Sequence, residues 1–339
     1  MQLSGKKPGN RFWALACAAA VISACGGSAP AAPSPSADGF SSPAVVPPVP
    51  LSWAIRGQVV AAPGGPPIAG ATLTMADAPP VTADDAGNYA IVTRDALTRP
   101  LLIAAPGYLT RETSLSGGEA HGGVQFDLIG SEPAFPLTQY REMVRNVFEH
   151  PASPEPSRRW TTDPNVYIWT TWKDSGAPVD PAAVQFLIGE IRRVIPLWTA
   201  DHFHAGQIEV GPEQRSAAAG WINVQFDRKG NWSRLGEDPG QVQFGSASTC
   251  MSLAIVHEFG HAMGYWHTGV KPSIMGGSPG SCRAFGLTPN EAVIARVLYS
   301  RAPGNMDPDR DGPAPPAPTY YLRGPASNVT VTCDAFLRR

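Results

Sequence analysis

The stretch His257-Glu-Phe-Gly-His261-Ala-Met-Gly264-Tyr-Trp-His267 decides how the second half of this chain folds. It overlaps an apolar run from Met251 to Met263, in which nearly every side of a helix would be apolar. Such a run predicts a helix buried at the centre of a domain. His257 and His261 are four residues apart, so in a helix they share one face. The stretch therefore predicts a buried helix that presents two imidazoles side by side.

The residues after this helix supply a third imidazole. Gly264 is suited to end the helix in a left-handed conformation, so that the chain turns and His267 comes back toward the other two histidines. Imidazole nitrogens bind zinc at about 2.0 to 2.1 Å, and three protein ligands leave the fourth position open, as in catalytic rather than structural sites. The spacing thus predicts one zinc ion held by His257, His261 and His267.

Glu258 follows the first histidine and points about 100° further round the helix, beside the metal position rather than onto it. A carboxylate in that place is able to take a proton from an attacking water and pass it to a leaving amine. Because a zinc site that only binds needs no general base, Glu258 favours a catalytic function and is the expected catalytic residue.

These spacings resemble the metzincin signature HExxHxxGxxH, and Met275 in Ser273-Ile-Met275-Gly resembles the Met-turn of that family. The resemblance covers residues 160–306, and the stretch 287–299 is similar to the C-terminal helix of matrixin-like members. It implies an α/β domain with a mixed five-stranded sheet and a zinc-dependent endopeptidase that acts on protein or peptide substrates. No tyrosine lies two residues after Met275 and no cysteine-switch motif is present, so neither of those family features is carried over.

The preceding residues fit such a domain. A helix is expected over residues 137–149, a strand over 165–172, and a second helix from Asp180-Pro181, which suit the N-cap and the first helical position. Further strands are expected at residues 206–210, 220–227 and 241–244. Strand, helix and then several strands indicate a mixed α/β architecture.

Residues 51–132 have a different pattern, in which short apolar runs alternate with turn signals such as PGGPPIAG and DDAGN. This pattern predicts a small β-sandwich. The strings that begin at Gly57, Ile68, Thr82 and Ala105 resemble the carboxypeptidase regulatory-like domain, which implies a transthyretin-like sandwich. No catalytic group stands out there, so we expect a positioning or binding module.

The N-terminus is typical of an export signal, with Lys6, Lys7 and Arg11 before an apolar run at residues 12–21. This run is about half as long as a membrane-spanning helix. Its end, Ile22-Ser-Ala-Cys25, resembles the bacterial lipobox, which implies a lipid on Cys25 that anchors the exported protein to the cell envelope. An ordinary secretory signal is the alternative. Residues 26–50 are rich in Pro, Ala and Ser and are expected to be a tether.

Cysteines and aspartates suggest two further features. In an exported chain Cys250, Cys282 and Cys333 allow three pairs, and we favour Cys250 with Cys282 because they flank the histidine stretch. Asp307, Asp309 and Asp311 begin like a calcium loop, but Pro318 stands where such a loop ends in Glu, so a polar linker is favoured and a calcium site is the alternative.

Composition sets limits on the whole. A chain of 339 residues suggests about two domains, and 26 Lys+Arg against 28 Asp+Glu gives no sign of a nucleic-acid partner. With 35 Gly and 36 Pro, a helical bundle is not expected. The expected segments are 1–25 (signal), 26–50 (tether), 51–132 (sandwich), 133–306 (metzincin domain) and 307–339 (C-terminal extension).

Two alternative functions stay open. In one, the chain is a surface binding lipoprotein whose metzincin domain is secondary or inactive. In the other, it is a zinc hydrolase of cell-wall peptides. The sequence leaves the oligomeric state undetermined.

Overall fold

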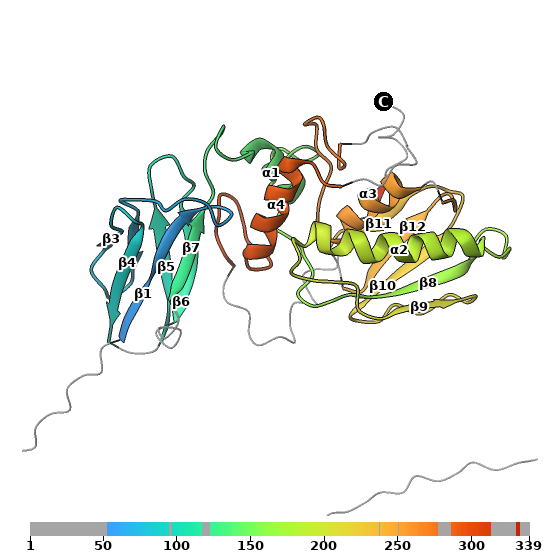
Figure 1. Cartoon of the computed structure of the whole chain (residues 1–339), viewed down its shortest axis with the longest axis horizontal. Helices are drawn as coiled ribbons and strands as arrows, with labels where there is room; N and C mark the ends of the chain where they lie inside the picture. Colours follow the sequence, from blue (N-terminus) through green and yellow to red (C-terminus); the bar gives the residue numbers. More distant parts are fainter. Residues whose placement is uncertain are drawn as a thin grey trace, which may run out of the picture. The chain divides into compact units, whose positions relative to one another are not determined.

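The fold is described by a computed structural model, which covers residues 53–94, 97–116, 123–236, 238–249, 251–276, 286–312 and 330–332 (Figure 1). The export signal, Cys25, the tether, Cys250 and Cys282 lie outside the described residues. Within the described ranges, no helix has the length and apolar character needed to cross a membrane.

The first half forms two sheets around one hydrophobic core. One sheet has the strand order β4-β1-β7 and the other β3-β2-β5-β6. Each sheet turns one face to this core because side chains alternate along a strand: in β4 those of Tyr89, Ile91 and Thr93 are buried and those between them are exposed. The strands are β1 (Trp53–Ala61), β2 (Thr72–Met75), β3 (Val81–Thr82), β4 (Asn88–Thr93), β5 (Thr98–Ala104), β6 (Arg111–Ser116) and β7 (Val124–Leu128).

The second half is a mixed α/β structure. Its sheet has the order β13-β11-β12-β10-β8-β9, in which β9, β8, β10 and β12 are parallel and β11 runs antiparallel to β12. The predicted mixed sheet of five strands is confirmed, and β13 adds a sixth at the edge of β11. The strands are β8 (Asn165–Trp172), β9 (Ile208–Gly211), β10 (Trp221–Phe226), β11 (Trp232–Arg234), β12 (Gly240–Phe244) and β13 (Thr330–Thr332).

Four helices occur in the described ranges: α1 (Leu137–Arg145), α2 (Pro181–Trp198), α3 (Ser252–Ala262) and α4 (Pro289–Ser300). Alternate residues of β8, such as Val166 and Ile168, share one core with the apolar residues of α2 and α3. Figure 1 shows α2 running along this sheet. At the end of α2 the Trp198 indole donates to the Val256 carbonyl at 2.8 Å, which fixes α3 against α2.

Two predicted details differ from the structure. The first helix ends at Arg145 rather than at residue 149, because Asn146 adopts a left-handed conformation with φ +58° and its N–H caps the Arg141 carbonyl. Residues 147–149 therefore form a turn. Strand β11 was not predicted, since three residues are too few to show alternation.

The aspartates considered as a possible calcium loop have other partners. Asp307 accepts from Arg141 at 2.9 Å, Asp309 from Arg301 at 2.8 Å, and Asp311 from Asn305 at 2.8 Å. Among the described residues, the one group of three side chains that could hold a metal is a histidine group elsewhere. The three carboxylates therefore accept from arginine and asparagine side chains, and they do not form a group close enough to hold a calcium ion together.

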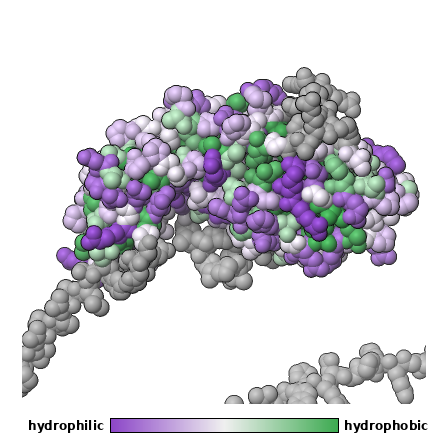
Figure 2. Space-filling view, in the orientation of Figure 1, coloured by the Kyte–Doolittle hydropathy of each residue, from purple (hydrophilic) through white to green (hydrophobic). Residues whose placement is uncertain are grey.

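The described residues, which lie between 53 and 332, belong to one compact unit. On the face shown in Figure 2, hydrophilic and hydrophobic residues are interspersed. The large apolar side chains exposed in the described ranges come from separate segments, and single exposures of this kind are ordinary. They are Val92, Leu97, Leu102, Phe148 and Val210.

Candidate metal centre

Helix α3 carries the first two histidines through the middle of the core. Every residue from Ile255 to Ala262 is buried, as the all-round apolar pattern predicts. A Cβ on Gly260 would lie 2.6 Å from the Met275 sulfur and 3.0 Å from the Trp198 ring. Glycine at this position therefore lets both side chains pack directly against the helix that holds the histidines.

Gly264 turns the chain after α3. Its φ is +111°, and a Cβ there would lie 1.9 Å from the Arg158 carbonyl oxygen. Two backbone hydrogen bonds close the turn, from Gly264 N to His261 O at 2.8 Å and from Tyr265 N to Gly260 O at 3.0 Å. The chain reverses within three residues, and His267 returns to the helix.

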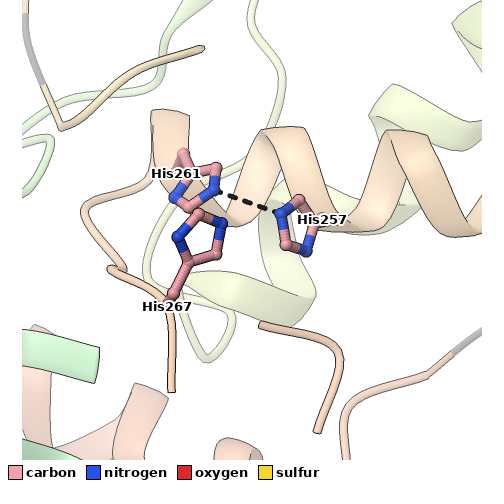
Figure 3. Close-up of side chains that lie close together, drawn as sticks. All are labelled: His257, His261 and His267. Carbon is pink, nitrogen blue, oxygen red and sulfur yellow. Dashed lines mark hydrogen bonds between the residues drawn. The ribbon is translucent and has the colours of Figure 1, made fainter. Parts of the chain in front are cut away.

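The three histidines converge, as Figure 3 shows. Their ligand atoms all lie within 4.8 Å of one another, and His257 Nε2 is 3.2 Å from His261 Nε2. Two nitrogens on one tetrahedral zinc ion, each at 2.0 to 2.1 Å, would be roughly 3.3 Å apart. The exposed fractions of His257, His261 and His267 are 5%, 0% and 2%. The spacing and the burial both fit a single enclosed cation.

The other ring nitrogens fix which atoms face the centre. His257 Nδ1 lies 2.8 Å from the Ile274 carbonyl oxygen, and His261 Nδ1 lies 2.6 Å from that of Tyr265. His267 Nδ1 lies 2.7 Å from Glu149 Oε1. Carbonyl and carboxylate oxygens only accept, so each Nδ1 donates and each Nε2 keeps its lone pair for a metal.

Burial also holds the first two imidazoles in the form that binds metal. It lowers the pKa of His257 to about 4, with a smaller contribution from His267. It lowers the pKa of His261 well below its ordinary value, and here His257 and His267 contribute. Both rings are therefore neutral near pH 7, which metal ligation requires. Two neutral nitrogens that face each other at 3.2 Å repel unless a cation lies between them.

Glu258 is buried, with 1% of its surface exposed, directly after His257 on α3. Its backbone carbonyl accepts a hydrogen bond from Ser233 Oγ of β11 at 2.8 Å. This contact ties the middle of α3 to the antiparallel strand of the sheet, so the carboxylate and the first ligand are held on one rigid turn.

Met275 is fully buried beneath α3, and its segment is held by a residue that sequence reasoning missed. Glu291 Oε1 accepts from Ser273 Oγ at 2.6 Å and from Ile274 N at 2.7 Å. Ile274 is also the residue whose carbonyl accepts from His257. Glu291 thus supports a metal ligand through two successive hydrogen bonds. Its pattern with Thr288, a capping box, was a sequence signal for the helix start but not for this contact.

Glu149 was also missed, and no local pattern could have found it, because 118 residues separate it from its partner His267. The remaining described histidines are exposed and belong to no metal group: His202 and His204 lie in a loop, and His150 follows the turn after α1.

No protein-family model matches this chain, and no curated protein is significantly similar to it. The interpretation of the site therefore depends on its own geometry.

Proposed function

We propose that this protein is a zinc-dependent endopeptidase. The observation that carries the proposal is the convergence of three buried imidazoles, each with its Nδ1 held by an acceptor, together with a buried glutamate, Glu258, that directly follows the first of them on α3. A site that only stored or sensed a metal would not need a carboxylate next to the ligands.

The ligand set supports zinc. Neutral imidazoles are common zinc ligands, and His257, His261 and His267 would supply three of the four ligands of a zinc ion. When bound there, zinc would polarise the scissile carbonyl and lower the pKa of the attacking water.

The chain's own part in the reaction falls to Glu258. Its carboxylate would accept one proton as the water oxygen attacks the peptide carbonyl carbon, and would give that proton to the amine nitrogen as the C–N bond breaks. Because α3 is buried along most of its length, Glu258 and the two histidines are carried by one rigid helix.

Several features support the finer proposal of a metzincin-type domain. The helix that bears His257 and His261 packs on the mixed sheet, and Met275 lies against Gly260 of that helix. We further propose that the two-sheet half is a carboxypeptidase regulatory-like positioning module, and that a lipid on Cys25 holds the exported protein at the cell envelope. Cys250 and Cys282 remain the disulfide pair that we favour.

The test compares the purified full chain with its Glu258→Gln variant on unfolded casein and on cell-wall peptides, with metal content measured for both. We expect the wild type to bind one zinc ion and cleave casein, a chelator to stop cleavage, and the variant to keep zinc while losing about 10²- to 10⁴-fold in rate.

Other results favour the alternatives. Cleavage of cell-wall peptides but not casein would change the substrate class and keep the mechanism. Zinc bound by both proteins with no cleavage of either substrate would favour the surface binding lipoprotein. A wild type without zinc would contradict the metal site itself.

A further inference from the structure

We propose that Glu149 is a positioning residue for the third metal ligand, His267, and that it sets the metal affinity of the site. The inference rests on the metal centre of the proposed function. It concerns a carboxylate that lies outside the histidine stretch, in the turn that follows α1.

The third ligand needs outside support more than the other two. His257 and His261 stand on the rigid helix α3, and their Nδ1 atoms are oriented by the nearby carbonyls of Ile274 and Tyr265. His267 instead follows the turn at Gly264 and lies outside any helix or strand. Its Nδ1 meets the Glu149 carboxylate at 2.7 Å, so a charged acceptor replaces the backbone acceptors used by the other ligands.

The end of α1 brings this carboxylate to the site. Asn146 stops the helix with its left-handed conformation, and the following turn is closed by a hydrogen bond from His150 N to Asn146 O at 2.8 Å. Glu149 therefore projects from a tight turn rather than from a helix. Had α1 continued to residue 149, as the sequence predicted, the carboxylate would leave the helix axis in a different direction.

Two further contacts hold α1 against the ligand segment. Trp266 N donates to the Met143 carbonyl at 2.7 Å, immediately before the ligand. Immediately after it, the Glu142 carboxylate accepts from Thr268 Oγ1 and from Gly269 N. His267 is thus held in two ways: its neighbours in the chain are bonded to α1, and its ring is bonded to Glu149.

A carboxylate on Nδ1–H has two effects on the metal ligand. It fixes the tautomer and the plane of the ring, and it makes the opposite nitrogen a stronger electron donor. The Glu149 side chain is 31% exposed, so it keeps contact with solvent while its partner ring is only 2% exposed. An ionised acceptor at that boundary does not require the burial of an isolated charge.

The test measures zinc affinity of the full chain by competition with a chelator, for wild type, Glu149→Ala, Glu149→Gln and a control, Glu155→Gln. Glu155 is a matched control because its side chain is 26% exposed, and because it accepts from Asn146 and Arg158 rather than from a metal ligand. We expect Glu149→Ala to weaken zinc binding roughly ten- to a hundredfold. The Glu149→Gln variant, which keeps an acceptor but not its charge, should lose less, and the control should stay within about twofold of wild type.

The visible absorption spectrum of the cobalt-substituted proteins is the second readout, because it reports ligand geometry directly. It should shift in both Glu149 variants and not in Glu155→Gln, with circular dichroism of the metal-free proteins showing that all are folded. Wild-type affinity and spectrum in folded Glu149→Ala would overturn the inference while leaving the metal site intact. If the wild type itself bound neither metal, the proposed function would fail instead.

Discussion

Gly264 is a position where both the backbone conformation and close packing require glycine. Its φ of +111° is unfavourable for a residue with a Cβ, and that Cβ would lie 1.9 Å from the Arg158 carbonyl oxygen. A backbone oxygen cannot rotate away as a flexible side chain can, so Gly264→Ala must displace the segment that carries His267. We expect this variant to lower the free energy of unfolding by about 3 kcal/mol or more, measured by urea denaturation.

Gly176→Ala separates the two causes. Gly176 also has a positive φ, +68°, but nothing lies within 4 Å of the position that a Cβ would occupy. Only the conformational cost remains, and it should be about 1 to 2 kcal/mol. Equal losses in the two variants would show that the approach of Arg158 contributes nothing to the need for glycine at residue 264.

At the scale of elements, Glu291 joins the start of α4 to the segment beneath the metal ligands. It is fully buried and accepts from Thr288 N, Ser273 Oγ and Ile274 N. Removing the carboxylate leaves several buried donors without an acceptor, each at a cost of about 1 to 3 kcal/mol. We therefore expect Glu291→Ala to lower the free energy of unfolding by about 3 kcal/mol or more, and to weaken zinc binding through Ile274 and His257.

Asp180→Ala is the comparison for this prediction. Asp180 caps α2 by accepting from Ala182 N at 2.9 Å, and this hydrogen bond is exposed to solvent. Loss of such a cap costs about 1 kcal/mol. Chemical denaturation of both variants checks the difference, and a Glu291→Ala variant no less stable than Asp180→Ala would contradict the bridging function of Glu291.

Glu190 connects α2 to the first residue of α3 and gives the fold a dependence on pH. Burial alone would raise its pKa, but hydrogen bonds from Arg193 and Ser252 outweigh burial and hold the pKa below its ordinary value of 4.5. As the pH falls from about 4.5, the unfolded chain takes up this proton first, so the stabilisation is complete above that pH and is lost through the lower, folded pKa.

Unfolding midpoints in urea with a chelator present, from about pH 6 to pH 3, measure this effect. We expect wild type to lose stability as the pH falls, and Glu190→Gln to lose less over the same interval. Parallel curves for the two proteins would mean that the Glu190 carboxylate does not contribute to the pH dependence.

At the scale of the whole molecule, buried charges join the two hydrophobic cores. Arg301, at the end of α4, is buried and pairs with Asp127 of β7 and with Asp309, while Arg111 of β6 also pairs with Asp127 at 2.7 Å. Asp127 is the partner that both guanidinium groups share, and breaking a buried pair by removing one partner costs about 3 to 5 kcal/mol. Asp127→Ala should therefore destabilise the protein by that amount, measured by denaturation followed by circular dichroism.

Asp174→Ala provides the contrast. Asp174 pairs with Arg228 at 2.9 Å, but 56% of the Arg228 side chain is exposed, and pairs of this kind contribute about 0 to 1 kcal/mol. If Asp127→Ala cost no more than Asp174→Ala, the charges between the two cores would not contribute to the stability of the whole.

The sequence by itself determined the local features of this protein. Helix α3, strand β8, the start of α2 at Asp180-Pro181 and the mixed α/β class follow from the periodic placing of apolar residues, from capping residues and from the order of elements. The number of strands in the sheet was instead what the resemblance to a known family implied. The spacing of His257, His261 and His267 predicted their convergence for the same reason, since a helical turn and a glycine act over a few residues.

Only the tertiary structure decided which distant groups support that centre. Glu149 reaches His267 across 118 residues, because Asn146 ends α1 early and the turn redirects the chain. Glu291 reaches Ile274 because the start of α4 lies against the segment that follows α3. Asp307 and Asp309 pair with arginines because the fold brings Arg141 and Arg301 to them. Such contacts depend on packing between elements that are far apart in the sequence, and the periodic pattern of residues within one element does not predict them.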